Sequence, residues 1–225
     1  MDNDVLRQAP LFSSLDDEAA TALGGSMAET TLRRGDVLFH EGDSGDKLYV
    51  VTEGKVKLGR SASDGRENLL AIMGPGQMFG ELSLFDPGPR SATVTAVTDA
   101  TFASLSHEDL LRWLDGRPIV ARGLLTQLAS RLRKSNDVVA DLVFSDVPGR
   151  VAKALLDLAD RFGRTADDGV HVHHDLTQEE LAQLVGASRE TVNKALADFA
   201  SRGWLRLEPR SVVIMDVERL SRRAR

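Results

Sequence analysis

The chain has 225 residues, of which 42% are hydrophobic, so it can supply hydrophobic cores for two domains of ordinary size. It contains no cysteine, which excludes disulfides, cysteine-bound zinc, cysteine-bound iron–sulfur clusters and thiol catalysis. No apolar run approaches the roughly 18 residues that cross a bilayer, and the N-terminus MDNDVLRQAP has neither a basic start nor an apolar stretch. We therefore expect a cytoplasmic protein without a membrane partner.

The net charge of −6 hides an asymmetry between the two parts of the chain. Residues 1–116 carry 10 Lys and Arg against 19 Asp and Glu, whereas residues 117–225 carry 18 against 15. The overall charge argues against a general binder of polyanions, but the C-terminal part alone is basic. A contact with nucleic acid is therefore expected in the C-terminal part.

The N-terminal part is expected to be a helix followed by an all-β unit. The helix covers residues 15–28. From Leu32 to Leu105, short apolar or β-branched runs alternate with turn signals such as Gly35-Asp36 and Gly42-Asp43. No interval between these signals can hold a crossover helix, so the pattern favours a roll or barrel over a parallel α/β sheet.

One long helix is expected from about Ile119 to Leu142, directly after Pro118. Apolar or small residues recur in it at alternating steps of four and three, which is the spacing of a two-stranded coiled coil. We interpret this seam as a homodimer contact. A helix packed on its own β unit is the alternative. The seam residues are Ala121, Leu125, Leu128, Leu132, Ser135, Val139 and Leu142.

The long helix is expected to end at a hinge, residues 145–149, because Pro148 disfavours helical geometry in the residue before it and Gly149 makes the backbone after it more flexible. Further elements are expected beyond the hinge. They are a helix over 150–162, a strand over 170–173, two helices between 177 and 201, and a strand pair over 205–207 and 212–215.

Residues 176–200, LTQEELAQLVGASRETVNKALADFA, predict a helix-turn-helix. Thr177 and Glu180 have the spacing of a capping box, and the first helix ends at Gly186. Ser188 caps a second helix. Its buried face is expected to consist of Val192, Leu196 and Phe199.

The start of the second helix carries side chains that can read DNA bases. Arg189, Glu190, Asn193 and Lys194 point outward and offer donors for guanine and an acceptor for the cytosine amine. Hydroxyl groups of Ser188 and Thr191 suit phosphates, and the strand pair after Gly203 is typical of a wing. The alternative is a domain that does not bind DNA, in which Arg189 and Glu190 form a solvated pair.

Residues 79–92, FGELSLFDPGPRSA, predict an anion site inside the β unit. A glycine leads into a short helix, whose free backbone N–H groups attract an anion. Arg90 supplies a fork of donors, Ser91 a hydroxyl, and Glu81 an acceptor for a sugar hydroxyl. This segment can hold a nucleotide phosphate.

The chain resembles regulators of the cyclic AMP receptor protein and FNR superfamily over essentially its whole length. GELSLFDPGPRSA is similar to their phosphate-binding cassette, FSDVPGRVA to their hinge and LTQEELAQLVGASRETV to their helix-turn-helix, in the same order and spacing. The likeness is strongest to actinobacterial cyclic AMP receptor proteins, in stretches such as DGRENLLAIMGPG and GASRETVNKALADFA.

The resemblance implies an α+β architecture in four parts. These are an N-terminal β-roll that binds a cyclic nucleotide (1–116), a long dimerisation helix (117–144), a hinge (145–149) and a C-terminal winged helix-turn-helix domain (150–225).

The resemblance also implies roles for cassette residues. Glu81 binds the ribose 2′-hydroxyl, Arg90 and Ser91 bind the cyclic phosphate, and Gly80 lets the backbone approach, with Leu82 beside them. Three residues of the dimer helix join the site. Arg131 matches a family arginine that can pair with Glu81, and Ser135 and Asn136 meet adenine, one of them from the partner subunit.

On the DNA side, base reading is implied for Arg189, Glu190 and Lys194. Lys194 replaces an arginine of the best-known members and lacks its bidentate fork, so discrimination at that base pair is expected to be looser. The DNA contact set is completed by Thr177, Ser188 and Thr191.

The expected protein is a homodimeric transcription regulator and not an enzyme. Cyclic AMP is its allosteric effector, no metal is required, and its partners are palindromic double-stranded DNA with TGTGA-like half-sites and RNA polymerase. A same-fold regulator with another effector or none is one alternative, and a sensor module of an enzyme or kinase is the other. His171, His173 and His174 are interpreted as surface strand residues, not metal ligands, and Arg222, Arg223 and Arg225 as a solvated tail.

Overall fold

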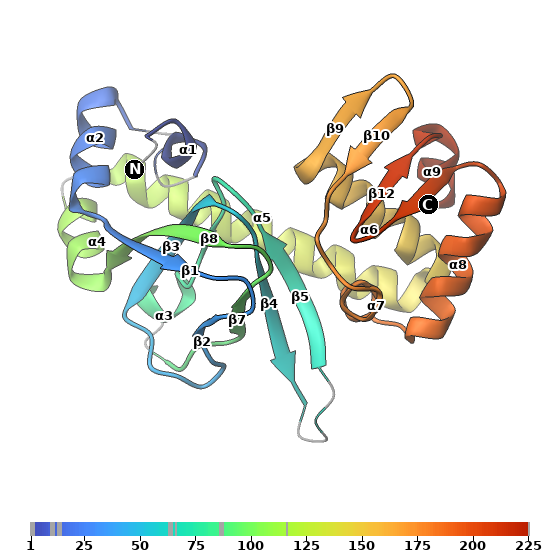
Figure 1. Cartoon of the computed structure of the whole chain (residues 1–225). Coiled ribbons are helices and arrows are strands. Elements are labelled where there is room, and N and C mark those ends of the chain that lie inside the picture. Colours follow the sequence, from blue (N-terminus) through green and yellow to red (C-terminus); the bar gives the residue numbers. More distant parts are fainter. Residues whose placement is uncertain are drawn as a thin grey trace. The chain divides into compact units, whose positions relative to one another are not determined.

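The computed structural model describes residues 3–9, 12, 15–62, 65, 67–85, 88–115 and 117–224. They fall into two compact units, Met1–Arg60 with Leu70–Lys134 and Ser61–Leu69 with Ser135–Arg225. We call these the first and the second unit and describe each by itself (Figure 1). Asp86, Pro87, Gly116 and Arg225, which the sequence analysis used, lie outside the described residues.

Two four-stranded sheets make up most of the first unit, apart from their residues 61 and 67–69, which fall in the second unit (Figure 1). One has the order β1 (Ala28–Leu32), β8 (Ala100–Ser106), β3 (Lys47–Glu53), β6 (Met78–Phe79). The other has the order β2 (Val37–Phe39), β7 (Thr93–Ala96), β4 (Val56–Ser61), β5 (Glu67–Met73). Neighbours in the first sheet pair antiparallel, as do β2 with β7 and β7 with β4. The expected all-β unit is confirmed.

Short helices flank the sheets. They are α1 (Asn3–Gln8), α2 (Asp17–Ser26), α3 (Leu82–Phe85) and α4 (His107–Leu114). Asp16 caps α2, because its Oδ1 accepts a hydrogen bond of 2.8 Å from the backbone N–H of Ala19. The helix expected over residues 15–28 is therefore present in a slightly shorter form.

Two groups of buried side chains hold the first unit together. One joins Leu6 and Phe12 of the N-terminal segment to the sheet and to Val120 and Leu124 of the long helix. The other contains four aromatic rings, in which Tyr49 stacks on Phe79 with ring centroids 5.4 Å apart. Phe79 directly precedes the predicted phosphate cassette, so the aromatic group anchors the start of that segment.

The long helix α5 (Pro118–Phe144) has two faces with different surroundings. Val120 and Leu124 are buried in the core of the first unit. Along the predicted seam, Leu125, Leu132 and Val139 are 66%, 64% and 61% exposed in the single chain. The helix therefore packs on its own unit with one face, while these residues of the predicted seam lie on another, exposed face.

The second unit combines helices with a small antiparallel sheet. Its helices are α6 (Val147–Phe162), α7 (Gln178–Val185), α8 (Arg189–Ser201) and α9 (Val217–Arg223). The sheet has the order β11 (Leu205–Glu208), β12 (Ser211–Ile214), β10 (Gly169–Val172), β9 (Gly163–Ala166). The predicted side chains Val192, Leu196 and Phe199 are all buried.

Three details of the second unit differ from the expectation. α6 begins at Val147 instead of Arg150, because Asp146 caps it and a proline is tolerated in the first turn of a helix. β9 was not predicted, since GRTA has no alternating apolar pattern. The C-terminal segment, expected to be a solvated tail, forms α9, which Asp216 caps and whose Leu220 is buried.

Among the described residues, every helix is too short or too polar to cross a membrane.

Two glycines allow a test of the turns in the first unit. Gly54 has a φ of +77°, and a Cβ there would lie 2.1 Å from the carbonyl oxygen of Asp99. Gly42 has a φ of +91° with open space around it. We expect Gly42→Ala to lower the free energy of unfolding by about 1–2 kcal/mol, the cost of a left-handed backbone, and Gly54→Ala to lower it further because the backbone must also move.

Urea titration in a Trp204→Phe background, in which Trp113 fluorescence reports the first unit, measures both variants. Equal losses in the two variants would show that the contact at Gly54 relaxes without cost.

Candidate ligand site and nucleic-acid interface

Arg90 is the central group of the predicted cassette, and it is 4% exposed. Its Nη1 donates to the backbone oxygens of Lys47 at 2.9 Å and Gly80 at 3.0 Å. The guanidinium carbon lies 4.3 Å from the centre of the Phe39 ring. Arg90 is thus a buried cation held by two carbonyls and the face of an aromatic ring.

The backbone around Arg90 leaves no room for larger residues. Gly80 has a φ of +81°, and a Cβ on it would lie 2.8 Å from Nη1 of Arg90. A Cβ on Gly45 would lie 2.7 Å from Nε of Arg90. Gly80 belongs to the predicted cassette but Gly45 does not, because a close approach between distant segments leaves no local signal.

Glu81, which follows Gly80 in the cassette, is buried, with 1% of its side chain exposed. Its Oε1 accepts a hydrogen bond of 2.5 Å from Nη1 of Arg131 on α5, whose second guanidinium nitrogen donates to the carbonyl oxygen of Met78. The Arg131–Glu81 pair implied by the family resemblance is therefore present.

Among the described residues of the cassette, two buried side-chain atoms have no hydrogen-bond partner. They are Nε of Arg90, which is a donor, and Oε2 of Glu81, which is an acceptor. Burying such groups unpaired costs roughly 1–3 kcal/mol or more. The described part of the cassette therefore holds one unused donor, which suits an anion, and one unused acceptor, which suits a hydroxyl group.

The remaining predicted ligand residues have different surroundings. Ser91 is exposed, and Leu82 is 52% exposed. Ser135 and Asn136 are exposed residues of α5 and belong to the second unit. Their contact with a base stays a prediction.

The helix-turn-helix forms as local rules predict. Thr177 and Glu180 make the reciprocal capping box, with the N–H of Thr177 donating to Glu180 at 2.7 Å and the N–H of Glu180 donating to Thr177 at 3.1 Å. Gly186 ends α7 with a φ of +69°, a left-handed geometry that glycine adopts without strain. Ser188 caps α8 by accepting from the N–H of Thr191.

The outer side of the first turns of α8 carries the predicted base-reading side chains. Arg189, Glu190 and Lys194 are exposed, and Nζ of Lys194 lies 2.6 Å from Oε1 of Glu190. Thr191, predicted to contact phosphate, is exposed beside them. Asn193 differs from the expectation, because it is half-buried and its Oδ1 is a buried atom without a hydrogen-bond partner. Asn193 therefore faces the body of the unit more than the outward set does.

The histidine cluster is also corrected in part. His173 is exposed and His171 half-buried, but His174 is 5% exposed, and its Nδ1 accepts a hydrogen bond of 3.1 Å from the N–H of Leu176. His174 is a core residue that holds the chain before α7. No group of three or more possible metal-ligating His, Asp and Glu side chains occurs within the described ranges.

Comparisons with known proteins agree with this geometry. A cyclic nucleotide-binding domain family matches residues 29–117, and a Crp-like helix-turn-helix domain family matches residues 149–223. A CRP-like cAMP-activated global transcriptional regulator of Mycobacterium tuberculosis is 55% identical over 99% of this chain and 100% of its own length. The cyclic AMP receptor protein of Thermus thermophilus is 37% identical over 94% of both chains.

The fold is shared more widely than the sequence. The structure of FixK2 from Bradyrhizobium japonicum superposes with a TM-score of 0.78 at 24% identity, covering 87% of this chain and 96% of that one. At this identity the likeness concerns the fold alone, and it agrees with the α+β class expected from the sequence.

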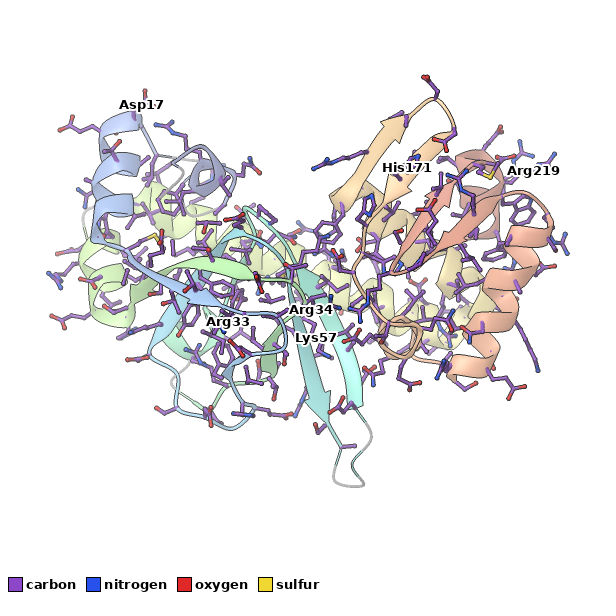
Figure 2. The ribbon with its side chains drawn as sticks, in the orientation of Figure 1. Asp17, Arg33, Arg34, Lys57, His171 and Arg219 are labelled. Atoms are coloured by element: carbon purple, nitrogen blue, oxygen red, sulfur yellow. The ribbon has the colours of Figure 1, made fainter. Side chains whose placement is uncertain are left out.

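An exposed ion-pair cluster links the two hairpins of the second unit. Oδ1 of Asp168 lies 2.6 Å from Nε2 of His171 on β10, which Figure 2 labels, and its Oδ2 accepts from Arg206 on β11 at 2.8 Å. The hydrogen bond to His171, followed by that to Arg206, lowers the pKa of Asp168 from 3.8 to about 2.

A lowered folded-state pKa means that Asp168 stabilises the second unit above pH 4 and loses this effect as the pH falls toward 2. We expect Asp168→Asn to lower the free energy of unfolding at pH 6, and the difference from wild type to shrink as the pH falls from 4 toward 2. Urea titrations followed by Trp204 fluorescence measure it, with Asp167→Asn in the same turn as control. A difference that stays constant with pH would contradict the assignment.

Proposed function

Because the chain belongs to the cyclic AMP receptor protein and FNR superfamily of transcription regulators, we propose that it is a homodimeric, cyclic AMP-responsive regulator that binds palindromic DNA. The observation that carries this proposal is the pair of buried, unpartnered atoms in the cassette, the donor Nε of Arg90 and the acceptor Oε2 of Glu81. The proposed effector supplies a hydrogen-bond partner for each of these two atoms.

The chemistry of a cyclic nucleotide fits this pair. Its phosphate supplies a negative charge that would compensate the positive charge of the Arg90 guanidinium. The exposed hydroxyl of Ser91 is a further donor to the phosphate. Its ribose 2′-hydroxyl is a donor for Glu81. Gly80 keeps space for the backbone to approach the ligand, since a Cβ there meets Arg90. Leu82 completes the cassette.

The partner subunit enters the proposal through α5. The exposed seam residues Leu125, Leu132 and Val139 pair with those of a second copy, which removes their apolar surface from water. Ser135 and Asn136 lie on the same exposed stretch, where we place the adenine, with one of the two residues coming from the partner.

The parts of the chain are assigned accordingly. Residues 1–116 bind the effector, 117–144 form the dimerisation helix, 145–149 connect it, and 150–225 bind DNA. The effector shifts an equilibrium between orientations of the two DNA-binding parts. In the DNA-binding orientation the two recognition helices are about 34 Å apart, one turn of DNA, as in other helix-turn-helix dimers.

DNA recognition is assigned to the exposed start of α8 and the caps beside it. Arg189, Glu190 and Lys194 read base edges, and hydroxyl groups of Thr177, Ser188 and Thr191 contact phosphates. TGTGA-like half-sites are the proposed target. We propose RNA polymerase as a further partner and the cytoplasm as the location, because both fit a regulatory role. We propose no catalytic activity and no metal.

Substitution of Arg90 tests the effector site. We expect Arg90→Ala to weaken cyclic AMP binding by tenfold or more, since charged hydrogen bonds contribute about 1.5–3 kcal/mol each, and to abolish stimulated DNA binding while the dimer persists. Calorimetry, gel filtration and a DNA mobility shift measure the three properties. Arg112→Ala on α4 is the matched control, because Arg112 pairs with Asp109 of its own helix.

Unchanged stimulation in Arg90→Ala would overturn the cassette assignment. Calorimetry with cyclic GMP beside cyclic AMP separates the proposed effector from another cyclic nucleotide, and tight DNA binding without any nucleotide would favour a regulator that needs none.

Substitution of Arg189 tests base reading. We expect Arg189→Ala to cost about 1–3 kcal/mol of DNA binding and to relax preference at one base position. Binding to a set of duplexes with single base changes measures both. Arg202→Ala at the other end of α8, where Arg202 pairs with Asp198 at 2.8 Å, is the control. An equal loss on all duplexes would make Arg189 a phosphate contact.

A further inference from the structure

The guanidinium of Arg90 contacts both sheets of the first unit. Its Nη1 donates to the carbonyl oxygens of Lys47 on β3 and of Gly80, which directly follows β6, and both strands belong to one sheet. The ring that lies 4.3 Å from its guanidinium carbon is that of Phe39 on β2, a strand of the other sheet. Arg90 is therefore held by segments that are distant from one another in the sequence.

A second ring lies near the same cation. The guanidinium carbon of Arg90 is 5.7 Å from the centre of the Tyr49 ring. The ring centroids of Phe39 and Tyr49 are 5.9 Å apart, and those of Phe39 and Phe79 are 6.3 Å apart, which are distances at which aromatic pairs attract. Tyr49 stacks on Phe79 and is its direct partner in the pairing of β3 with β6. The buried ring of Phe79 therefore helps to fix both rings that face the cation.

These two rings compensate the cation only through their faces. Phe39 has no titratable group. Burial raises the pKa of Tyr49, and the opposing effect of the Arg90 cation is smaller, so the phenol stays protonated at neutral pH. The face of a neutral aromatic ring attracts a cation through the partial negative charge of its π system. The guanidinium of Arg90 is thus stacked but not neutralised.

The contacts of Arg90 define the direction in which its Nε points. A guanidinium is planar, so a ring against its face fixes the plane, and two acceptors at Nη1 fix the rotation within that plane. The Nε atom is buried and has no hydrogen-bond partner among the described residues. Gly45 leaves room beside it, since a Cβ there would lie 2.7 Å from Nε. The protein itself therefore orients this donor.

A ring and a phosphate can contact one guanidinium together. The ring occupies the face, whereas an anion accepts from the N–H groups at the edge. The energy of the ring contact is then similar in the free and the bound protein and cancels from the binding free energy. Orientation does not cancel, because the apparent affinity falls with the fraction of molecules in which the donor points correctly. A ring that fixes the plane therefore raises affinity by preorganisation.

We propose that Phe39 is a positioning residue, whose ring holds the plane of Arg90 so that Nε points at the phosphate of a cyclic nucleotide, with Tyr49 in support. The proposal rests on the proposed function above and adds a residue outside the cassette. Phe39 is half-buried in a strand of three residues. A phenylalanine in a strand is common, so only the tertiary contact with Arg90 distinguishes it.

The test is calorimetry of cyclic AMP binding to the full chain, accompanied by thermal unfolding. Phe39→Leu keeps an apolar side chain without a ring face. We expect it to bind about fivefold more weakly than wild type, as when the productive orientation of Arg90 is occupied about one-fifth of the time. Phe39→Tyr keeps the ring face and is expected to bind like wild type. A loss in Phe39→Tyr as large as that in Phe39→Leu would overturn the proposal.

A double-mutant cycle separates a role through Arg90 from a direct contact with the ligand. Arg90→Gln has no guanidinium to orient, so in this background Phe39→Leu is expected to cause no further loss of cyclic AMP affinity. An equal loss in both backgrounds would make Phe39 a contact of the ligand or of the core and overturn the proposal. Unchanged or tighter binding in Phe39→Leu alone would also contradict it.

Phe12→Leu is the matched control. Phe12 is 2% exposed and belongs to the other buried group of the first unit, so the same substitution there removes a ring without touching Arg90. It is expected to lower the melting temperature and to leave cyclic AMP affinity unchanged. If it weakened binding as much as Phe39→Leu, the effect would be one of stability, and the positioning role would be wrong.

Tyr49→Leu serves if Phe39→Leu does not fold. It removes the more distant ring and is expected to weaken cyclic AMP binding less, and only when Arg90 is present. No loss in this variant would then overturn the proposal. A wild-type protein that does not bind cyclic AMP would instead overturn the proposed function, and the role of Phe39 with it, so the two failures are distinguishable.

Discussion

The buried guanidinium of Arg90 is the group on which the proposed effector response depends. A full positive charge is stable away from water only when its surroundings compensate it. Among the described residues, Arg90 is compensated by two backbone carbonyls and the face of Phe39, and its Nε is left unpaired. Carbonyls and rings supply partial charge only, so the negative charge of a phosphate would compensate the guanidinium better than these neutral groups do. The same reasoning applies to Glu81. Its Oε1 is paired with Arg131, while its Oε2 has no hydrogen-bond donor among the described residues.

Helix α5 contributes one side chain to an ion pair in each of the two units. Arg131 of α5 contacts the carboxylate that would bind the ribose, and Asp141 of the same helix contacts Lys153 of the second unit. Between these two residues every position from Leu132 to Ala140 is exposed. Each of the two pairs lies within one unit, and the exposed stretch between them is where we propose the dimer contact.

The elements predicted well are those that local rules specify. The capping box at Thr177, the left-handed cap at Gly186 and the cap at Ser188 each depend on residues within a few positions of one another, and all three are present. The elements missed depend on packing. α9 is short, and its place depends on Leu220 being buried by α6 and on Arg223 meeting Asp146, far away in the chain. His174 looked like part of a polar strand end, and only its neighbours in space make it a core residue.

From the sequence alone, hydrophobic spacing, caps and turn residues were sufficient to determine the order of the parts, the β-rich first unit, the long helix and the helix-turn-helix. These signals suffice because each arises from interactions between residues close in the chain. The tertiary structure decided which polar atoms stay buried without a partner and which distant carbonyls a given arginine holds. Arg90 meets Lys47, and Arg150 meets Val185 and Gly186, across long separations in sequence. No local pattern encodes such contacts, because they exist only after the hydrophobic cores have brought the segments together.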